Sequence, residues 1–338
     1  MRFDLQMDRV EDWIRDRGIS SVALQFPEGL KARATEVSGR IWSDLGVRAV
    51  ILGCPCYGAC DLFTDYRRYA EGLVHFGHSP IPGLADDDGV LFVEARAEVA
   101  IEGPLKAVLG SLPDRVGLLA SVQYVGLLED AKRIIEGSGR TAAIGKGDGR
   151  IFYPGQVLGC NCSAALSVSG EVDCFLFIGE GDFHPLAAAF GVDRRLIVLD
   201  PMTGEARSVD DLRDRILRKR FAQMEAARGA RSFLVVLCGK VGQYRPREAD
   251  RAEAMLREAG REAHRMVADE VSPQALLPYR VDAFVSTACP RVAMDDQARY
   301  PRPMLTVPEL EIVLGRRAWE DYAFDSIRGR PASPARPS

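Results

Sequence analysis

A threefold internal repeat constrains the fold of this 338-residue chain more strongly than any other feature of its sequence. Three apolar, strand-like segments open the repeats, and they begin at Ser21, Arg115 and Ser232. Each is followed by a polar or glycine-containing loop and then by a segment with apolar residues at helical spacing. The helices are expected at about residues 31–45, 126–138 and 247–259. Because strands and helices alternate, the repeat predicts an α/β fold with mainly parallel sheets covered by helices.

The repeat divides the chain into three α/β units, and a length of 338 residues fits two or three domains. We predict units at residues 1–104, 105–227 and 228–320, followed by a tail at 321–338. A helix at about residues 209–227 is dense in arginine and aspartate. We expect it to bridge the second and third units and to keep one solvated face.

The composition excludes several classes of protein. A net charge of −4 offers no broad basic surface for direct binding of nucleic acid. No apolar run approaches the roughly 20 residues that a membrane span requires, and the first residues lack the apolar region of a signal peptide. We therefore expect a cytoplasmic protein without a membrane partner. In that reducing compartment, eight cysteines indicate metal or catalytic chemistry more than disulfides.

Three of the cysteines follow strand-like segments that are far apart in the sequence. The apolar run at 281–288 leads to Cys289, and the proline after it cannot continue a strand ladder. Similar runs lead to Cys60 and Cys160. Ligands bind at the carboxyl ends of strands in open α/β sheets, so the three thiols are expected to meet there. Cys289 lies farther from its opening strand than the other two, which predicts that it leaves a later strand.

The cysteine spacing limits the kind of metal centre. Structural zinc sites usually use Cys-x-x-Cys knuckles, and the sequence contains none. Its closely spaced pairs, Cys54-Pro-Cys56 and Cys160-Asn-Cys162, suit a knuckle poorly. The common radical-SAM signature is also absent, because Phe63 stands where its third cysteine would be. Three thiolates on a cubane 4Fe–4S cluster, by contrast, leave one iron with an open coordination site for a substrate.

Polar side chains follow the same predicted strands and are candidates for a pocket around the cysteines. They are Gln25, Glu28, Asp61, His75, His78, Glu180, Asp182, His184 and Arg291. A histidine at a strand end is more often a structural hydrogen-bonding group than a ligand. His78 is nevertheless favoured, because Gly77 lets the backbone come close to a bound molecule. Cys174 and Cys238 lie within apolar runs, and we interpret them as small buried hydrophobic residues.

Several motifs in combination resemble those of a known family. They are Gln25-Phe-Pro-Glu-Gly-Leu30, Tyr57-Gly-Ala-Cys-Asp61, Phe76-Gly-His-Ser79, Gly155-Gln-Val-Leu-Gly-Cys160-Asn and Thr287-Ala-Cys-Pro-Arg291. Over residues 20–314 the chain resembles the archaeal diphthamide synthases, which are 2-(3-amino-3-carboxypropyl)histidine synthases. The resemblance implies a homodimer whose subunits each hold a 4Fe–4S cluster on Cys60, Cys160 and Cys289. It also implies three α/β domains arranged with pseudo-threefold symmetry around that central cluster.

The resemblance implies the chemistry as well. Members of this family transfer the 3-amino-3-carboxypropyl group of S-adenosyl-L-methionine (SAM) to C2 of a histidine imidazole in translation elongation factor two. This is the first step of diphthamide biosynthesis, and it leaves 5′-methylthioadenosine. Most radical-SAM enzymes release a 5′-deoxyadenosyl radical, whereas this family breaks the bond between sulfur and Cγ. An electron donor is required as a further partner.

We expect the SAM pocket to use charged residues beside the cluster. Ion pairs strengthen in a water-poor cleft, so we assign Arg291 to the α-carboxylate of SAM and Glu28 or Asp61 to its amino group. Gln25 and His78 complete the predicted set of SAM-binding residues.

Two alternative functions stay open at this point. Quinolinate synthases also combine three α/β repeats with a three-cysteine 4Fe–4S cluster, but they use no SAM. A zinc-stabilised binding protein would contain zinc instead of about four iron and four sulfide ions per chain. An assay for SAM cleavage distinguishes a quinolinate synthase from a diphthamide synthase. A metal analysis distinguishes a zinc protein from an iron–sulfur protein.

The ligand assignment has competitors within the sequence. Cys56 competes with Cys60, and Cys162 competes with Cys160, because each pair lies close together in the chain. We prefer Cys60 and Cys160, since the motif residues around them match those of the family. Cys54 is left without a predicted role.

Overall fold

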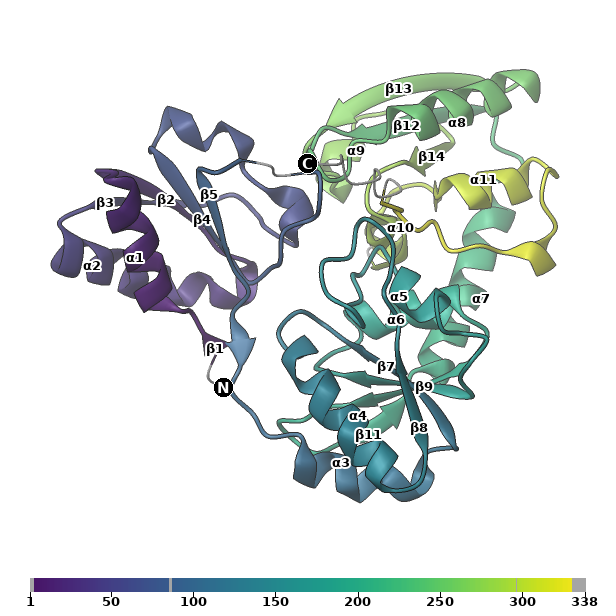
Figure 1. Cartoon of the computed structure of the whole chain (residues 1–338). Helices are drawn as coiled ribbons and strands as arrows, with labels where there is room; N and C mark the ends of the chain where they lie inside the picture. Colours follow the sequence, from purple (N-terminus) through teal and green to yellow (C-terminus); the bar gives the residue numbers. More distant parts are fainter. Residues whose placement is uncertain (1–2, 85–86, 296, 330–338) are drawn as a thin grey trace, which may run out of the picture.

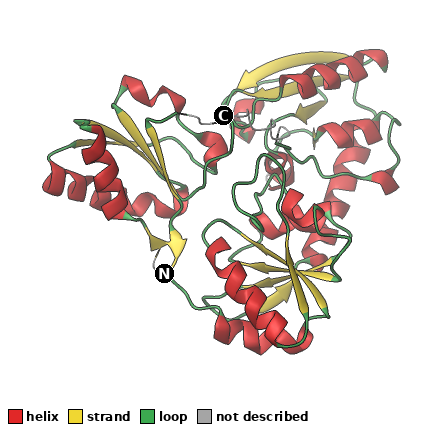
Figure 2. Ribbon diagram, in the orientation of Figure 1, coloured by secondary structure: helices red, strands yellow, loops and turns green. Residues whose placement is uncertain are grey.

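The computed structural model describes residues 3–84, 87–295 and 297–329. Its main strands form three separate sheets, and Figure 1 shows one lobe of the molecule for each. Helices flank the strands in all three lobes (Figure 2). The α/β fold class with mainly parallel sheets is therefore confirmed. None of the helices among the described residues has the length and apolar character needed to cross a membrane.

The first sheet is parallel and has the strand order β3-β2-β4-β5. Its strands are β2 (Ser21–Gln25), β3 (Arg48–Leu52), β4 (Gly72–Phe76) and β5 (Val90–Val93). The helices of this lobe are α1 (Met7–Arg17), η1 (Glu28–Arg33), α2 (Ala34–Leu45), η2 (Ala59–Asp61) and η3 (Thr64–Arg68). A small antiparallel pair, β1 (Phe3–Asp4) and β6 (Arg96–Ala97), lies beside it. The strand order reverses between β2 and β4, and open α/β sheets bind ligands at the carboxyl ends of such strands.

The second sheet has the order β11-β10-β9-β7-β8, and only β11 is antiparallel to its neighbour. Its strands are β7 (Arg115–Ala120), β8 (Thr141–Ile144), β9 (Cys174–Ile178), β10 (Arg195–Leu199) and β11 (Ala206–Ser208). Its helices are α3 (Glu102–Val108), η4 (Leu109–Ser111), η5 (Val125–Leu127), α4 (Leu128–Gly137), α5 (Ser163–Leu166) and α6 (Phe183–Gly191). The strand expected directly before Cys160 was a wrong prediction. Only two isolated bridges form there, Ala120 with Gln156 and Leu158 with Asn161, because Gly155 turns the backbone with a left-handed φ of 74°.

The third sheet is parallel, in the order β13-β12-β14-β15. Its strands are β12 (Ser232–Cys238), β13 (Glu262–Ala268), β14 (Ala283–Ser286) and β15 (Met304–Leu305). Its helices are α8 (Pro246–Glu258), α9 (Pro273–Leu276), α10 (Pro290–Asp295), η6 (Gln297–Arg299), α11 (Val307–Val313) and η7 (Trp319–Asp321). Counted along the chain, Cys289 follows β14, the third strand of its sheet. Cys60 follows β3 and Cys160 follows β8, and each of these is the second strand of its own sheet. The prediction that Cys289 leaves a later strand is confirmed.

Helix α7 (Asp210–Ala227) runs from the core of the second sheet to the core of the third. Val209, directly before it, belongs to the second core, and Met224 near its end belongs to the third. Between them, the Arg220 side chain is completely buried and donates hydrogen bonds to the Glu309 carboxylate at 2.8 and 2.5 Å. Burial alone would raise the pKa of Glu309, but the charge and hydrogen bonds of Arg220 lower it.

This buried ion pair predicts a large effect of removing one partner. Arg220→Met leaves Glu309 charged, buried and unpaired, so the free energy of unfolding is expected to fall by about 3–5 kcal/mol. Arg220→Met combined with Glu309→Gln should recover part of that loss. The control is Arg228→Met, because Arg228 and Glu225 form an exposed pair worth less than about 1 kcal/mol. Denaturant unfolding measures all three variants, and equal effects of Arg220→Met and Arg228→Met would contradict the assignment.

Candidate metal centre

Three cysteines from three different sheets come together at the centre of the molecule. Cys60 lies on η2 after β3, Cys160 lies between β8 and α5, and Cys289 lies between β14 and α10. The thiols of Cys160 and Cys289 are within hydrogen-bonding distance, and Cys60 interacts electrostatically with both. All three are free thiols. We call them the three-cysteine site.

A loop that the sequence analysis did not single out, residues 239–245 after β12, links two of these cysteines. The side-chain amide of Gln243 donates to the Asp61 carboxylate at 2.9 Å, and its nitrogen lies 3.6 Å from the Cys60 sulfur. Its carbonyl oxygen accepts the backbone N–H of Cys289 at 3.1 Å. Gln243 therefore holds the Cys60 loop of the first sheet next to the Cys289 loop of the third.

At Gly242 the same loop contacts both the first and the second lobe. Its N–H donates to the carbonyl oxygen of Cys60 at 3.1 Å, and its own carbonyl accepts from Arg150 Nη2 at 2.8 Å. A Cβ added at Gly242 would lie 2.4 Å from the Cys60 α-carbon, which is backbone and cannot move aside cheaply. The absence of a side chain is thus what permits this approach.

The three thiols lie in unequal electrostatic surroundings. Burial and the neighbouring Asp61 carboxylate raise the pKa of Cys60. The hydrogen bond from Cys289 and the positive charge of Arg150 lower the pKa of Cys160 to about 6. The positive charge of Arg150 therefore favours the thiolate form of the cysteines beside it. Metal and iron–sulfur centres bind thiolates, so three converging thiols beside a buried cation fit such a centre.

The carboxyl ends of β4, β9 and β14 lead to a second set of side chains, His78, His184 and Arg291. His78 interacts electrostatically with His184, and His184 with Arg291. Burial, followed by these neighbours, lowers the pKa of both histidines to about 4, so both rings are neutral at physiological pH. Arg291 lies 4.6 Å above the Phe183 ring.

Arg291 has one unused donor. Its Nε and Nη2 atoms bond the Asp295 carboxylate at 3.0 and 2.7 Å. Its Nη1 atom is buried and has no hydrogen-bond partner. An unpaired buried donor of a guanidinium is costly, so this atom marks a place where a carboxylate or another acceptor would bind favourably.

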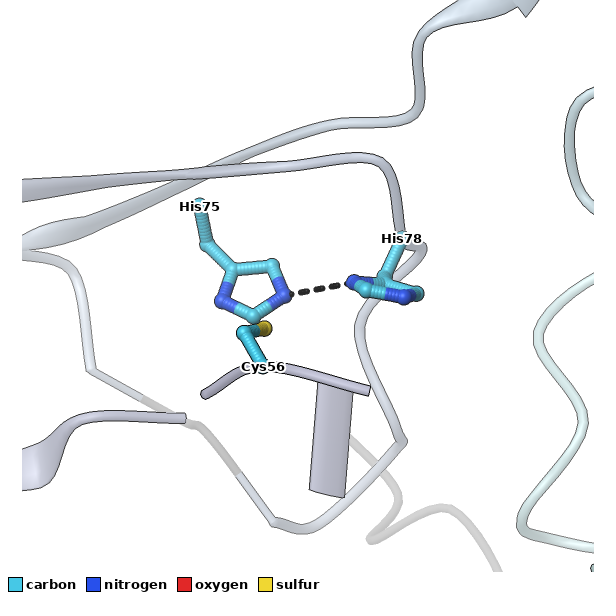
Figure 3. A group of neighbouring side chains, drawn as sticks. All are labelled: Cys56, His75 and His78. Carbon is cyan, nitrogen blue, oxygen red and sulfur yellow. Dashed lines mark hydrogen bonds between the residues drawn. The ribbon is translucent and has the colours of Figure 1, made fainter. Parts of the chain in front are cut away.

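Cys56, His75 and His78 form a further group whose possible ligand atoms lie within 4.8 Å of one another (Figure 3). In Figure 3 the two imidazole rings are joined by a hydrogen bond, which measures 2.9 Å. Burial and the nearby Asp61 carboxylate raise the pKa of Cys56 to about 12, so its thiol stays protonated. It is 3.8 Å from the carbonyl oxygen of Gly58 and donates to it. We interpret the group as a hydrogen-bonded network rather than a metal site.

The proton positions in this network follow from Gln25. Its amide nitrogen donates to the carbonyl oxygen of Asp61 at 2.8 Å, and its amide oxygen accepts the N–H of Phe63 at 3.2 Å. His75 Nδ1, 2.8 Å from the same oxygen, must therefore carry a proton and donate it. His75 Nε2 is then an acceptor, and His78 Nδ1 donates to it. This arrangement leaves a lone pair on His78 Nε2.

The predicted SAM-binding residues do not all gather at one place. Gln25, Asp61, His78 and Arg291 lie around the cysteines, as described above. The Asp61 carboxylate is 3.3 Å from the Lys240 ammonium group, so its charge is already paired. The Glu28 side chain is 54% exposed and pairs with Lys31 at 2.6 Å. No ion pair joins Glu28 to the cysteine loops among the residues that the structure describes.

The predicted tail at 321–338 is not free over its described part. The Ile327 N–H donates to the carbonyl oxygen of Cys160 at 2.8 Å, and Asn161 Nδ2 donates to Ile327 O at 2.9 Å. The Asp325 carboxylate pairs with Arg245, at the end of the 239–245 loop, at 2.6 Å. These contacts fix residues 323–329 over the Cys160 loop. Residues 330–338 lie outside the described residues.

Gln243, Lys240 and Arg150 were not among the predicted site residues. The one signal available for Gln243 was its position, since it follows the opening strand of the third repeat as Gln25 ends that of the first. The burial of Arg150 could not be read from a sequence in which arginine is abundant.

Two partly buried histidines, His78 and His184, predict a pH dependence. The pKa values of His78 and His184, lowered from 6.5 to about 4, keep both rings neutral until the pH falls near 4. Between pH 6.5 and pH 4 the unfolded chain binds more protons than the folded one. The free energy of unfolding therefore decreases as the pH falls from 6.5 towards 4. An NMR titration of the ring signals, assigned with His78→Gln and His184→Gln, checks this. Protonation of either ring near pH 6.5 would contradict the assignment.

The chain is similar to proteins of a known family. A family model described as "Putative diphthamide synthesis protein" matches residues 26–323. The 2-(3-amino-3-carboxypropyl)histidine synthase of Pyrococcus horikoshii is 37% identical over 325 residues, which cover 95% of this chain and 92% of that protein. The protein of the same name from Methanocaldococcus jannaschii is 26% identical over 351 residues, covering 96% and 94%.

Solved structures show the same relationship. A crystal structure of Dph2 from Pyrococcus horikoshii with a 4Fe–4S cluster matches with a TM-score of 0.88 and 34% sequence identity. The match covers 100% of this chain and 98% of that one. A second crystal structure of the same protein matches with a TM-score of 0.89.

Proposed function

The chain belongs to the diphthamide synthesis family, and we propose which of its residues carry the family's reaction. It is a 2-(3-amino-3-carboxypropyl)histidine synthase, a transferase with SAM as substrate and a 4Fe–4S cluster as cofactor. It transfers the 3-amino-3-carboxypropyl group to C2 of a histidine imidazole in translation elongation factor two. This is the first step of diphthamide biosynthesis.

The ligands of the cluster are Cys60, Cys160 and Cys289. The observation that carries this assignment is the convergence of the three thiols from three sheets, with Gln243 bonded between two of their loops. Cys162 is a poorer candidate than Cys160, because its sulfur lies where a Cβ on Gly191 would be, within the core of the second sheet. Cys56 lies beside His75 and His78, and its thiol donates to the Gly58 carbonyl instead.

When bound, the cluster supplies the electron that breaks the bond between sulfur and Cγ of SAM. The protein orients SAM for this cleavage. Arg291 Nη1, buried and without a partner, donates to the α-carboxylate. His78 Nε2, which keeps a lone pair, accepts a hydrogen bond from the α-ammonium group. Gln25 acts through His75 by fixing the proton that sets this tautomer.

The carboxylates considered for the ammonium group have weaker claims. Asp61 is held by Lys240 and Gln243, and its role is to place the Cys60 loop. Glu28 is engaged by Lys31 at the surface. We therefore place His78 ahead of both as the group that meets the SAM ammonium.

Two alternative functions lose their support. A quinolinate synthase would share three repeats and a cluster, and a zinc-stabilised binding protein would share the buried cysteines. The family match over residues 26–323 and the identity with named 2-(3-amino-3-carboxypropyl)histidine synthases favour neither.

Further features of the family are proposed for this chain. We propose that it acts as a homodimer in the cytoplasm, with three domains at residues 1–104, 105–227 and 228–320, and receives its electron from a separate donor protein. The substrate histidine belongs to another folded protein, so one side of the three-cysteine site must admit a loop of elongation factor two. Sedimentation of the reconstituted protein tests the dimer.

The ligand assignment predicts the metal content of cysteine variants. Cys60→Ala, Cys160→Ala and Cys289→Ala should each lose most of the iron, because the two thiolates that remain cannot hold the cluster. Iron and sulfide analysis after anaerobic reconstitution measures this. The matched controls are Cys174→Ala and Cys238→Ala, whose thiols lie within buried strands. Iron loss in Cys162→Ala together with full loading in Cys160→Ala would show that the ligand of the second lobe is Cys162.

The role of Arg291 predicts a loss of SAM affinity. Arg291→Met should raise the Kd for SAM by about tenfold or more, because a hydrogen bond to a charged group contributes about 1.5–3 kcal/mol. Equilibrium binding to cluster-loaded protein measures the effect, with exposed Arg280→Met as the control. An unchanged Kd in Arg291→Met with full iron content would remove this residue from the SAM site.

A further inference from the structure

Arg150 is a buried cation beside the three-cysteine site that the proposed function does not use. Its side chain enters from the loop between β8 and α5, and only 7% of the residue is exposed. Its Nη2 atom donates to the carbonyl oxygen of Gly242 at 2.8 Å. The N–H of Gly242 in turn donates to the carbonyl oxygen of Cys60. The backbone of one residue, Gly242, therefore links the guanidinium of the Cys160 loop to the Cys60 loop.

Arg150 differs from the other cations near the cysteines in how its charge is balanced. Three other cations near the cysteines each have a carboxylate partner: Lys240 with Asp61 at 3.3 Å, Arg245 with Asp325 at 2.6 Å and Arg291 with Asp295 at 2.7 Å. No carboxylate among the residues that the structure describes pairs with Arg150. Its Nε atom is buried and has no hydrogen-bond partner. A charged, desolvated donor in this state needs an anion nearby.

The anion that fits is the thiolate-bound cluster itself. The guanidinium interacts electrostatically with the thiols of both Cys160 and Cys60. Three thiolates give a 4Fe–4S cluster a net negative charge, and reduction adds one more. A fixed cation stabilises the more negative state more strongly, because the interaction grows with the charge and is little screened in a buried site.

We propose that Arg150 is the charge-compensating residue of the cluster, and that its guanidinium raises the reduction potential so that the donor can reduce the cluster. This inference rests on the proposed function, since it requires the cluster to be bound by Cys60, Cys160 and Cys289. It assigns to Arg150 an electrostatic role rather than a contact with SAM. The one electron comes from the donor and stays on the cluster until SAM is cleaved.

The test compares midpoint potentials of cluster-loaded variants, followed by absorption during a redox titration. Arg150→Gln removes the charge and should make reduction at least tenfold less favourable, a shift of about 59 mV to more negative potential for a one-electron couple. Arg150→Lys keeps a positive charge and should stay closer to the parent. Lys146→Gln removes the same charge from an exposed position on the same loop and should leave the potential unchanged.

The outcomes separate an electrostatic role from a structural one. An unchanged potential in a fully loaded Arg150→Gln protein would overturn the proposal. Loss of the cluster in both Arg150→Gln and Arg150→Lys would also overturn it, because it would assign Arg150 to holding Gly242. Loss in Arg150→Gln alone, with a parent-like potential in Arg150→Lys, would support it. A parent protein that binds no cluster would refute the proposed function and with it this role of Arg150, whereas an unchanged potential in a loaded variant refutes the role alone.

Discussion

The close approach of Gly242 to Cys60 is the constraint on which the rest of the site depends. The Gly242 N–H donates to the Cys60 carbonyl, and the Gly242 carbonyl accepts from the Arg150 guanidinium. The next residue, Gln243, reaches the N–H of Cys289. Because each cysteine comes from a different sheet, none of these contacts exists until the three lobes have docked. The three-cysteine site is thus a property of the tertiary structure and not of any one segment.

The repeated α/β fold could be predicted because its signals are local. The buried strands are apolar and the helices have a helical spacing of apolar residues, so each element is visible within its own segment. That Cys289 leaves a later strand could be predicted for the same reason, since its separation from the opening strand can be counted along the chain. For the run before Cys160, the same reasoning gave a wrong prediction. Its apolar residues suggested a strand, but Gly155 turns the backbone away from one.

The site could be predicted only in part, because its organising contacts are not local. Gln243 and Asp61 are 182 positions apart, and no periodicity or turn pattern encodes a polar contact over such a separation. Charge pairing also decides which of the predicted residues remain available to bind SAM. Arg291 keeps an unpartnered donor, whereas Glu28 is engaged by a neighbouring lysine. Such pairing depends on geometry that a residue count cannot supply.

The most direct test of this account is the iron content of Gly242→Ala after anaerobic reconstitution. The added Cβ would meet the Cys60 α-carbon at 2.4 Å, so the account predicts an intact fold by circular dichroism with much less than the parent's iron. Gly229→Ala is the matched control, since nothing lies within 4 Å of a Cβ there. Full iron loading in Gly242→Ala would contradict the claim that this close approach assembles the three-cysteine site.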